Sequence, residues 1–438
     1  MTLTARLDKA FGHPGMIAGS LLSVTVRLLD LPSRYGFHLL VAATLGVEQA
    51  GQFYIVFSVM TALGGLGRLG VDRALTRHLA IAMAEGRPDA VRPAIGRACR
   101  LVFGASALVS VLIFAAAHPF ARLVLGKPDL ALPLALGALA IIPQNLGAAM
   151  AGGLAGLQRV GFSQMIYSWL WPALFCLIAL ITGISLDGAL LLIALSFAVT
   201  AVVGGTLLRT FLPKGRNEMP APTLLRPGLS LFSLELTQLM ITAAPALILG
   251  IVASSREVGL FALAWRIALL INIVVSGVAA MASPRYAALH AGADLAGLGR
   301  ASSQAVGLCL ALTSVPVVVM LAFPAFLLGL FGPGYADGAM VLRVLALGQL
   351  AAAASSAMPE LLGMTGHMAD LRRLNALSLV VLLLGAAGLA ELYGALGTAL
   401  AVSASITVNG FGAVLLARRR LGLCPWARLA DIVWRRGR

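Results

Sequence analysis

Four arginines lie inside long apolar stretches of this sequence: Arg27, Arg34, Arg266 and Arg343. On insertion scales, one charge at the centre of a bilayer costs about 2.5 to 3.5 kcal/mol. Four unpaired charges would cost about 10 kcal/mol, which is comparable to the whole net stability of a domain. We therefore expect these guanidinium groups to face a polar cavity inside the protein, where they can bind an anion.

Acidic residues accompany the arginines. Asp30 lies between Arg27 and Arg34 at spacings of three and four residues, so the three side chains should share one face of a helix. Glu235 lies in a later apolar stretch. Asp30 and Glu235 are candidates for proton or cation coupling, because a buried carboxylate has a raised and tunable pKa.

Glu360 lies beside Pro359 near the end of another apolar stretch. It could act as a gate, pair with Arg372 or Arg373, or simply lie at the membrane interface. These interpretations stay open, and Glu360 is a third candidate for coupling or gating.

Internal pairing is the alternative to an anion site. Arg27 could pair with Asp30 on one helix, and Glu235 could pair with Arg266 or Arg34 across helices. The four arginines nevertheless exceed Asp30 and Glu235 in number, which leaves an excess positive charge similar to the negative charge of a diphosphate. Arginine suits phosphate because its rigid fork binds two oxygens and stays protonated. Our hypothesis is that the four arginines bind a diphosphate.

The remaining motifs indicate no covalent chemistry. The four cysteines are far apart and form no CxxC pair, and the six histidines are scattered, so we expect no metal site. The glycines from Gly65 to Gly70 match a dinucleotide fingerprint, but no strand precedes them, so we expect no cofactor. We expect no catalytic residues and no enzyme activity.

The composition is that of an integral membrane protein. Of 438 residues, 60% are hydrophobic and 11% are charged, and the mean hydropathy is +0.95. A soluble chain carries about 25% charged residues. Twelve apolar stretches are long enough to span a bilayer. They cover residues 18–45, 51–70, 95–117, 130–151, 162–183, 188–210, 228–253, 258–283, 302–328, 336–361, 373–390 and 394–417.

The basic residues predict the orientation of these spans. Of the 32 lysines and arginines, 25 fall in segments on the side of the two termini, and three fall on the other side. Basic loops stay in the cytoplasm, so both termini should be cytoplasmic. The net charge of +15 is thus mostly a topology signal, and we expect no nucleic-acid partner.

Two basic amphipathic segments should lie on the cytoplasmic membrane surface. In Asp72–Glu85, Arg73 and Arg77 share one face while Leu75 and Leu79 share another. In the tail, residues 418–438, Trp426 and other apolar residues alternate with arginines. Such helices bind anionic headgroups.

The two halves of the chain resemble each other. Glu48–Phe53 and Arg256–Phe261 both open a span and are 208 residues apart, and two further pairs repeat at nearly the same offset. Six spans per repeat predict parallel lobes related by an axis along the membrane normal, with a central cavity between them. We expect an N-terminal lobe at 1–212, a cytoplasmic linker at 213–227 and a C-terminal lobe at 228–417.

Three segments carry a family resemblance. Leu45-Gly-Val-Glu-Gln-Ala-Gly-Gln-Phe53 resembles the LGPxEYGxY pattern that begins the second span of the oligosaccharide flippase family, although Glu-Gln replaces the usual Pro-containing pair. Leu66–Ala80 is similar to the LxxLGLxxALxRxxA segment of that family, and Tyr393–Ala401 is similar to the start of its last span. The family belongs to the multidrug/oligosaccharidyl-lipid/polysaccharide exporter superfamily.

The resemblance implies a flippase that moves polyprenyl-diphosphate-linked oligosaccharide across the inner membrane by alternating access. It would serve O-antigen, capsule or exopolysaccharide assembly, with membrane lipids and other polysaccharide assembly proteins as partners. Two alternatives stay open. A cation-coupled multidrug exporter on a similar fold would be expected to have an acidic or aromatic cavity. A membrane polysaccharide polymerase or ligase would be expected to have a large catalytic loop outside the membrane.

Overall fold

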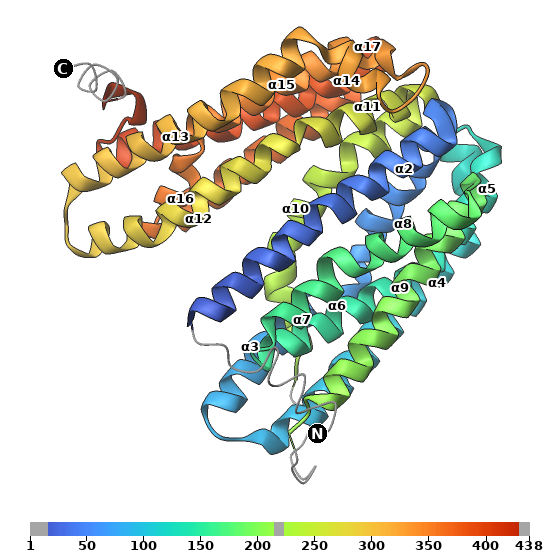
Figure 1. The fold of residues 1–438 in the computed structure, drawn as a ribbon, viewed down its shortest axis with the longest axis horizontal. Helices are drawn as coiled ribbons and strands as arrows, with labels where there is room; N and C mark the ends of the chain where they lie inside the picture. Colours follow the sequence, from blue (N-terminus) through green and yellow to red (C-terminus); the bar gives the residue numbers. More distant parts are fainter. Residues whose placement is uncertain (1–15, 214–222, 429–438) are drawn as a thin grey trace. The chain divides into compact units, whose positions relative to one another are not determined.

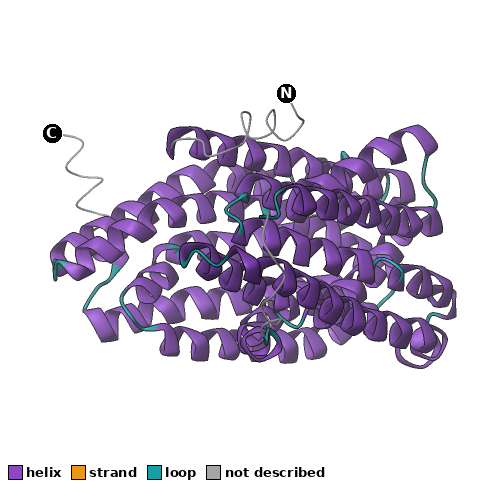
Figure 2. Ribbon diagram, turned by 90° about the horizontal axis from the view of Figure 1, so that it is seen from below, coloured by secondary structure: helices purple, strands orange, loops and turns teal. Residues whose placement is uncertain are grey.

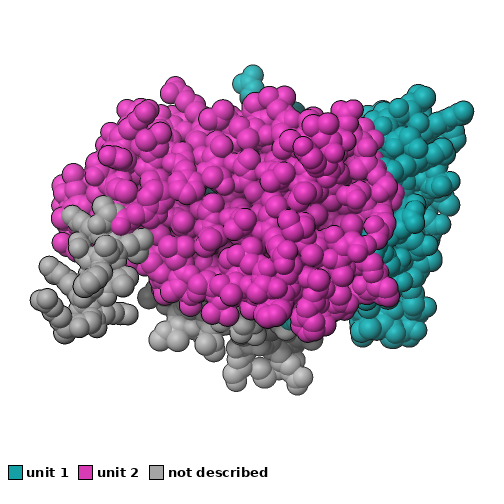
Figure 3. Space-filling view, turned by 90° about the horizontal axis from the view of Figure 1, so that it is seen from above, with its two compact units in different colours: residues 1–243 teal, residues 244–438 magenta. Residues whose placement is uncertain are grey.

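The computed structural model describes residues 16–213 and 223–428, and over these residues the chain forms helices and loops without a strand (Figure 2). Nine helical segments of the described chain are long and apolar enough to cross a membrane. The expectation of an all-α membrane protein is therefore confirmed. The chain divides into two compact units, Met1–Ala243 and Ala244–Arg438, which Figure 3 colours separately.

The helices of unit 1 follow one another with short connections (Figure 1). In chain order they are α2 (Met16–Gly64), η1 (Gly65–Arg68), α3 (Val71–Ala84), η2 (Pro88–Ala90), α4 (Val91–Pro119), η3 (Phe120–Val124), η4 (Pro128–Leu130), α5 (Ala131–Ala138), α6 (Ile141–Gly156), α7 (Val160–Gln164), η5 (Met165–Trp169), α8 (Leu170–Thr182), α9 (Leu186–Thr210) and the first part of α10 (Leu225–Val252).

Helix α2 contains two predicted spans joined by a single glycine. Gly46 has φ 69° and ψ 177°, which interrupts the helix. The hydroxyl of Tyr54 lies 3.4 Å from Nδ1 of His38, although 16 residues of continuous helix would separate them by about 24 Å. The chain therefore reverses at Gly46, and Figure 1 shows the two arms returning to the same end of unit 1. The loop expected at residues 46–50 shrinks to one residue with a left-handed backbone.

The apolar face of helix α3 packs against protein, so its leucines do not contact lipid as the amphipathic pattern of Asp72–Glu85 predicted. Leu75 and Leu79 are fully buried in a core shared with α4 and α6. Gly152 and Gly156 of α6 let α3 approach closely, because a Cβ at Gly156 would lie 2.9 Å from the carbonyl oxygen of Thr76. The Thr76 hydroxyl also donates to the carbonyl of Gly152 at 2.9 Å. Small residues four apart permit such helix contacts, and they cover the apolar face that the sequence assigned to lipid.

Unit 2 begins within α10 and is also entirely helical where it is described. Its further elements are α11 (Ser255–Ala268), α12 (Leu270–Ala291), α13 (Leu295–Ala322), α14 (Pro324–Gly329), η6 (Tyr335–Gly338), α15 (Ala339–Ser355), α16 (Ala357–Met364), α17 (Met368–Leu421) and η7 (Pro425–Arg428).

Helix α17 reverses in the same way as α2. Gly394 has φ 56° and ψ −131°, and the side chains of Asn409 and Asn375 are joined across the two arms by a 2.7 Å hydrogen bond. The carboxylate of Glu257 accepts a hydrogen bond from the backbone N–H of Ala395 at 2.7 Å. This contact satisfies one of the N–H groups that the break leaves without a helical partner. The predicted boundary between the last two spans is thus correct to a few residues.

The start of the tail also packs on protein. The indole N–H of Trp426 donates to the carbonyl of Ala354 at 2.9 Å, and its ring packs on Phe411. Ala354 lies where α15 gives way to α16, and Pro359 removes one N–H donor from that region. The indole of Trp426 therefore satisfies a carbonyl at a helix break, and the membrane-surface location of the tail stays a prediction. Residues 429–438 of the predicted tail lie outside the described residues.

Candidate functional site

Three side chains of unit 1 form a hydrogen-bonded group in the first arm of α2. Arg34 Nη2 lies 3.3 Å from Asp30 Oδ1 and 3.2 Å from the hydroxyl oxygen of Ser168. The Ser168 hydroxyl donates to the same Oδ1. The sequence placed Asp30 and Arg34 on one helical face, and the structure adds Ser168 from η5.

The group lies deep in the span. Arg34 is twelve residues before Gly46, or about 18 Å along the helix, and a hydrocarbon core is about 30 Å thick. Its side chain is 48% exposed and that of Asp30 is 29% exposed. Exposing a guanidinium to lipid at this depth would cost about 2.5 to 3.5 kcal/mol. The group therefore requires water or a ligand.

The ion pair holds only part of the Arg34 guanidinium. Nη2 makes both contacts, and Nε and Nη1 make no hydrogen bond within the described chain. Where water reaches it, an exposed pair four residues apart stabilises a helix by only about 0.3–0.5 kcal/mol. A hydrogen bond to a charged group contributes about 1.5–3 kcal/mol. A doubly bonded phosphate would thus be a stronger partner for Arg34 than Asp30 is.

Ser168 reaches the pair because the helix around it is wider than an α-helix. Met165–Trp169 forms a π-helical turn between α7 and α8. Pro172 has no N–H, so the carbonyl of Ser168 lacks its usual donor four residues later. Such turns often occur at functional sites. In the sequence, Pro172 could have indicated a disturbed helix at this point, but not the contact of Ser168 with α2.

Aromatic packing fixes the position of this part of α2. Phe37 is fully buried and contacts Trp171 and Phe175 of α8 at ring-centroid distances of 5.1 and 4.7 Å. It also contacts Phe53 on the second arm of α2 at 5.9 Å. Because Phe37 is three residues after Arg34, this cluster holds the charged face of α2 in a defined orientation.

Two predicted site residues cannot be placed in full. Arg27 lies on α2 and Glu235 on α10, but their side chains fall outside the part of the chain that the structure describes. The suggested pairing of Arg27 with Asp30, and of Glu235 with Arg266 or Arg34, stays a prediction. The partner that the structure shows for Asp30 is Arg34.

Arg266 lies in unit 2 at a similar depth in its own helix. It is twelve residues after Ser254, the N-cap of α11, or about 18 Å along the helix. Its guanidinium is half-buried and donates to the carbonyl of Ala262 at 3.0 Å. It lies in the last turn of α11, directly before α12 begins at Leu270.

Arg343 has a different environment. It lies near the start of α15, and its Nε donates to the carbonyl of Leu321 at 3.1 Å. Leu321 belongs to the last turn of α13, whose final four carbonyls have no helical donor. The contact makes Arg343 a cap for the C-terminal end of α13.

Glu360 lies in the first turn of α16 and faces α12. The Ser283 hydroxyl lies 3.5 Å from its Oε2, at the limit of a hydrogen bond. Arg373, one of its suggested partners, pairs instead with Asp370 at 3.8 Å. Within the described residues, Glu360 therefore makes no ion pair.

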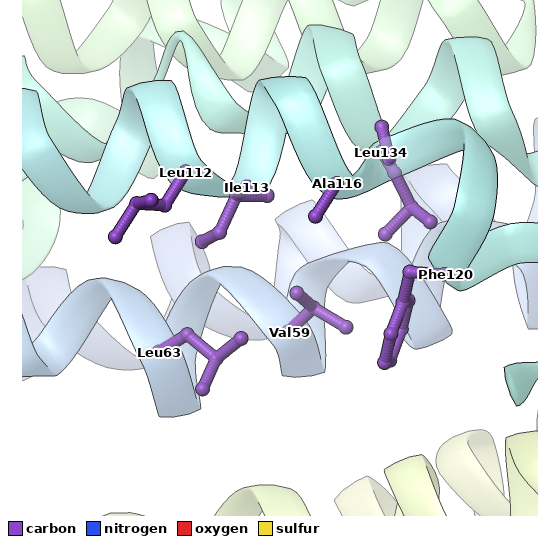
Figure 4. Close-up of a pocket in the computed structure, with 8 residues that line it drawn as sticks. Val59, Leu63, Leu112, Ile113, Ala116, Phe120 and Leu134 are labelled. Atoms are coloured by element: carbon purple, nitrogen blue, oxygen red, sulfur yellow. The ribbon is translucent and has the colours of Figure 1, made fainter.

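An apolar cavity of about 190 Å³ lies elsewhere in unit 1 (Figure 4). Figure 4 shows Val59 and Leu63 of α2 facing Leu112 and Ile113 of α4, with Phe120 and Leu134 near one end. Every lining residue is a hydrocarbon side chain. The cavity suits an alkyl chain and offers no donor for a diphosphate.

The sequence matches a known protein family over most of its length. Residues 16–290 match the model of the family described as polysaccharide biosynthesis protein. The chain belongs to the polysaccharide biosynthesis protein family. This membership confirms the resemblance inferred from the three sequence segments. None of the curated proteins matches the chain in sequence.

Solved structures show the same fold at low sequence identity. An inward-facing multidrug resistance MATE family transporter of the MOP superfamily has a TM-score of 0.72 and 14% identity, covering 92% of this chain and 98% of its own. The lipid II flippase MurJ in an inward closed conformation has a TM-score of 0.68 and 12% identity, covering 92% and 87%. An outward-facing MATE family transporter has a TM-score of 0.61 and 18% identity, covering 92% and 94%.

The family and the fold together identify the class of protein. Both the family and the fold are found in membrane transporters and flippases. The chain is accordingly a multi-pass membrane transporter, and the expectation that it is not an enzyme is confirmed.

Proposed function

We propose that this protein is a flippase that carries a polyprenyl-diphosphate-linked oligosaccharide across the inner membrane by alternating access. The product would enter O-antigen, capsule or exopolysaccharide assembly, together with other proteins of that assembly. Membership of the polysaccharide biosynthesis protein family supports this proposal. So does the likeness of its fold to that of a lipid II flippase.

One observation carries the choice of substrate. Arg34 presents an exposed guanidinium about 18 Å into a membrane span, and its Nε and Nη1 have no hydrogen bond within the described chain. Such a group requires a polar ligand at a depth where lipid supplies none. A diphosphate offers several oxygens at the spacing of the guanidinium fork. A cationic drug would be repelled by it.

We propose Arg34, Arg266 and Arg27 as the residues that bind the diphosphate. Arg34 lies about 18 Å along α2 from Gly46, and Arg266 lies about 18 Å along α11 from Ser254. Arg343 is left out of this set because its guanidinium caps the C-terminal end of α13. Both termini are proposed to be cytoplasmic, as the distribution of basic residues predicts.

The carboxylates are proposed to control the cycle. Asp30 shares α2 with Arg27 and Arg34, and Glu235 lies on α10. Protonation of either carboxylate would change the charge that the substrate meets. Glu360 faces Ser283 on α12 and makes no ion pair in the described chain. It is therefore available to form or break a contact between α16 and a neighbouring helix, and we propose it as a gate.

The proposal is tested by transport in proteoliposomes. The assay follows a fluorescent polyprenyl-diphosphate-linked sugar as it becomes accessible to a membrane-impermeant quencher. Removing one or two hydrogen bonds to a charged group costs about 1.5–3 kcal/mol each, so Arg34→Gln and Arg266→Gln should each slow transport by about 10-fold or more. The matched control is Arg122→Gln, an exposed arginine in η3, which should transport normally.

Two results would count against the proposal. Unchanged transport in both glutamine variants, at equal protein levels, would remove the arginines from the substrate site. Export of a cationic drug by the purified protein, without movement of the lipid-linked sugar, would favour the multidrug exporter instead.

A further inference from the structure

We propose that Asp30 is an internal competitor that occupies the anion site of Arg34 and Ser168 until the substrate diphosphate displaces it. This inference rests on the proposed function and assigns Ser168 as a residue that positions the anion. It explains why a carboxylate accompanies an arginine in the same turn of a membrane span. It also predicts the sign of an effect that simple charge pairing does not give.

The geometry defines a small oxygen-binding site. Two donors, Arg34 Nη2 and the Ser168 hydroxyl, converge on one oxygen atom, Asp30 Oδ1. The other carboxylate oxygen, Oδ2, accepts no hydrogen bond within the described chain. A phosphate oxygen at the position of Oδ1 would receive both donors, so Asp30 stands where one oxygen of the ligand would be.

Asp30 uses only part of the hydrogen-bonding capacity of Arg34. The Arg34–Asp30 distance of 3.3 Å is longer than the roughly 2.7–2.9 Å of a strong charge-assisted hydrogen bond. Arg34 Nε and Nη1 make no hydrogen bond in the described chain, so a diphosphate can bind them in addition to Nη2. Asp30 cannot offer a second oxygen in the fork arrangement at the observed geometry. The ligand thus gains contacts that the competitor lacks.

Ser168 is held in place for either partner. The π-helical turn at Met165–Trp169 directs its hydroxyl toward α2, and Pro172 lies in the chain just after that turn. The indole nitrogen of the neighbouring Trp169 is buried and has no hydrogen-bond partner in the described chain. The hydroxyl can donate to Asp30 or to a phosphate with no change in the backbone.

The competitor makes the site selective for multiply charged anions. A singly charged headgroup would replace Asp30 with an equal charge and gain few contacts. A diphosphate brings more charge and more acceptor oxygens, so it can exchange with Asp30 where a single carboxylate or a phosphodiester cannot. The ligand class assigned to the Asp30–Arg34–Ser168 site is therefore a terminal or lipid-linked diphosphate.

Binding of farnesyl diphosphate to the purified full-length protein tests the inference. Intrinsic fluorescence is a suitable readout, because Trp169 and Trp171 closely follow Ser168 in the sequence. Asp30→Asn should bind the probe about three- to tenfold more tightly than the wild type, because the competitor loses its charge. Ser168→Ala should bind it several-fold more weakly. Glu48→Gln is the matched control for loss of one exposed negative charge on α2, and it should leave binding unchanged.

A double-mutant comparison separates displacement from general electrostatics. The gain from Asp30→Asn should disappear in an Arg34→Gln background if Asp30 acts by occupying Arg34. If the gain persists there, the competitor idea is wrong. Asp30→Ser, which keeps a hydroxyl for hydrogen bonding without the charge, repeats the test should Asp30→Asn fail to fold.

The outcomes also distinguish this inference from the proposed function. Loss of binding in Arg34→Gln, combined with unchanged or weaker binding in Asp30→Asn, overturns the competitor and leaves the diphosphate site standing. Unchanged binding in Arg34→Gln overturns both. Tighter binding in Asp30→Asn together with an equal gain in Glu48→Gln assigns the effect to overall charge and rejects the competitor.

Discussion

The close approach of α3 to α6 can be tested by adding single methyl groups. Gly152 and Gly156 face α3, and a Cβ at these positions would lie 2.6 Å from the carbonyl oxygen of Asp72 and 2.7 Å from the Cβ of Leu79. Normal carbon contacts are about 3.5–4.0 Å. Helix α3 would have to move by about 0.5–1 Å, and backbone atoms cannot yield as a flexible side chain does.

The magnitude follows from a control on the same helix. Replacing glycine by alanine within a helix stabilises it by about 0.5–1 kcal/mol, which partly offsets the clash. Gly147 is also on α6, and its nearest neighbour would be the Cα of Ala201 at 4.0 Å. Gly147→Ala therefore carries the gain in propensity without the clash. The difference between Gly156→Ala and Gly147→Ala isolates overpacking, which costs about 1–3 kcal/mol.

Thermal unfolding in detergent measures this difference. Each kcal/mol corresponds to about 2–4 °C in Tm for domains of 150–250 residues, so Gly156→Ala should unfold several degrees below Gly147→Ala. Gly152→Ala should behave like Gly156→Ala. Equal Tm values for Gly156→Ala and Gly147→Ala would show that α3 does not dock on α6, and would restore the lipid contact expected from the sequence.

Three further predictions follow from described contacts. Gly394→Ala forces a left-handed backbone on alanine and displaces the Glu257 carboxylate, so it should destabilise the fold by about 1–3 kcal/mol. Gly388→Ala is the control, because a Cβ there meets open space. Equal Tm values for the two variants would contradict the prediction. Burial, with the nearby arginine, lowers the pKa of His78 from its ordinary value of 6.5. The stability gained from neutral His78 is complete above pH 6.5 and is lost as the pH falls below it, so Tm should fall more between pH 7.5 and 5.5 in the wild type than in His78→Gln; parallel curves would refute the assignment. Trp426→Phe removes one hydrogen bond and should cost about 0.5–1.5 kcal/mol in chemical or thermal unfolding, whereas an unchanged Tm would mean that the indole does not hold the helix break.

The membrane spans and the charged face of α2 could be predicted because both depend on local sequence. Apolar runs specify spans through length alone, and the spacing of Asp30 and Arg34 specifies a shared helix face. The partner of Asp30 was less certain, since Arg27 and Arg34 are both within one turn or so of it. Local spacing gave the candidates, and the structure shows the pair with Arg34.

Ser168 could not be predicted from its own neighbourhood. It is 134 residues from Arg34, and its reach depends on a π-helical turn that no periodicity of apolar residues reveals. The contact of Arg343 could not be predicted for a related reason. The sequence shows a charge in an apolar stretch, but the carbonyl that it caps belongs to another helix, Leu321 on α13.

The position of α3 shows why one amphipathic helix does not identify what covers it. Leu75 and Leu79 form the same apolar stripe whether they face lipid or protein. The deciding residues, Gly152 and Gly156, lie on a different helix about 80 residues later in the chain. Small residues four apart indicate close helix packing, so this glycine pair makes protein an alternative to lipid as the partner of the apolar stripe on α3.

The single-glycine reversals at Gly46 and Gly394 have a consequence for biosynthesis. No extended loop separates the two arms of either helix. We therefore expect the arms of α2, and likewise those of α17, to insert as helical hairpins. A flexible insert at either reversal would let the two arms insert into the membrane separately. Each arm would then depend on its own hydrophobicity to stay in the bilayer.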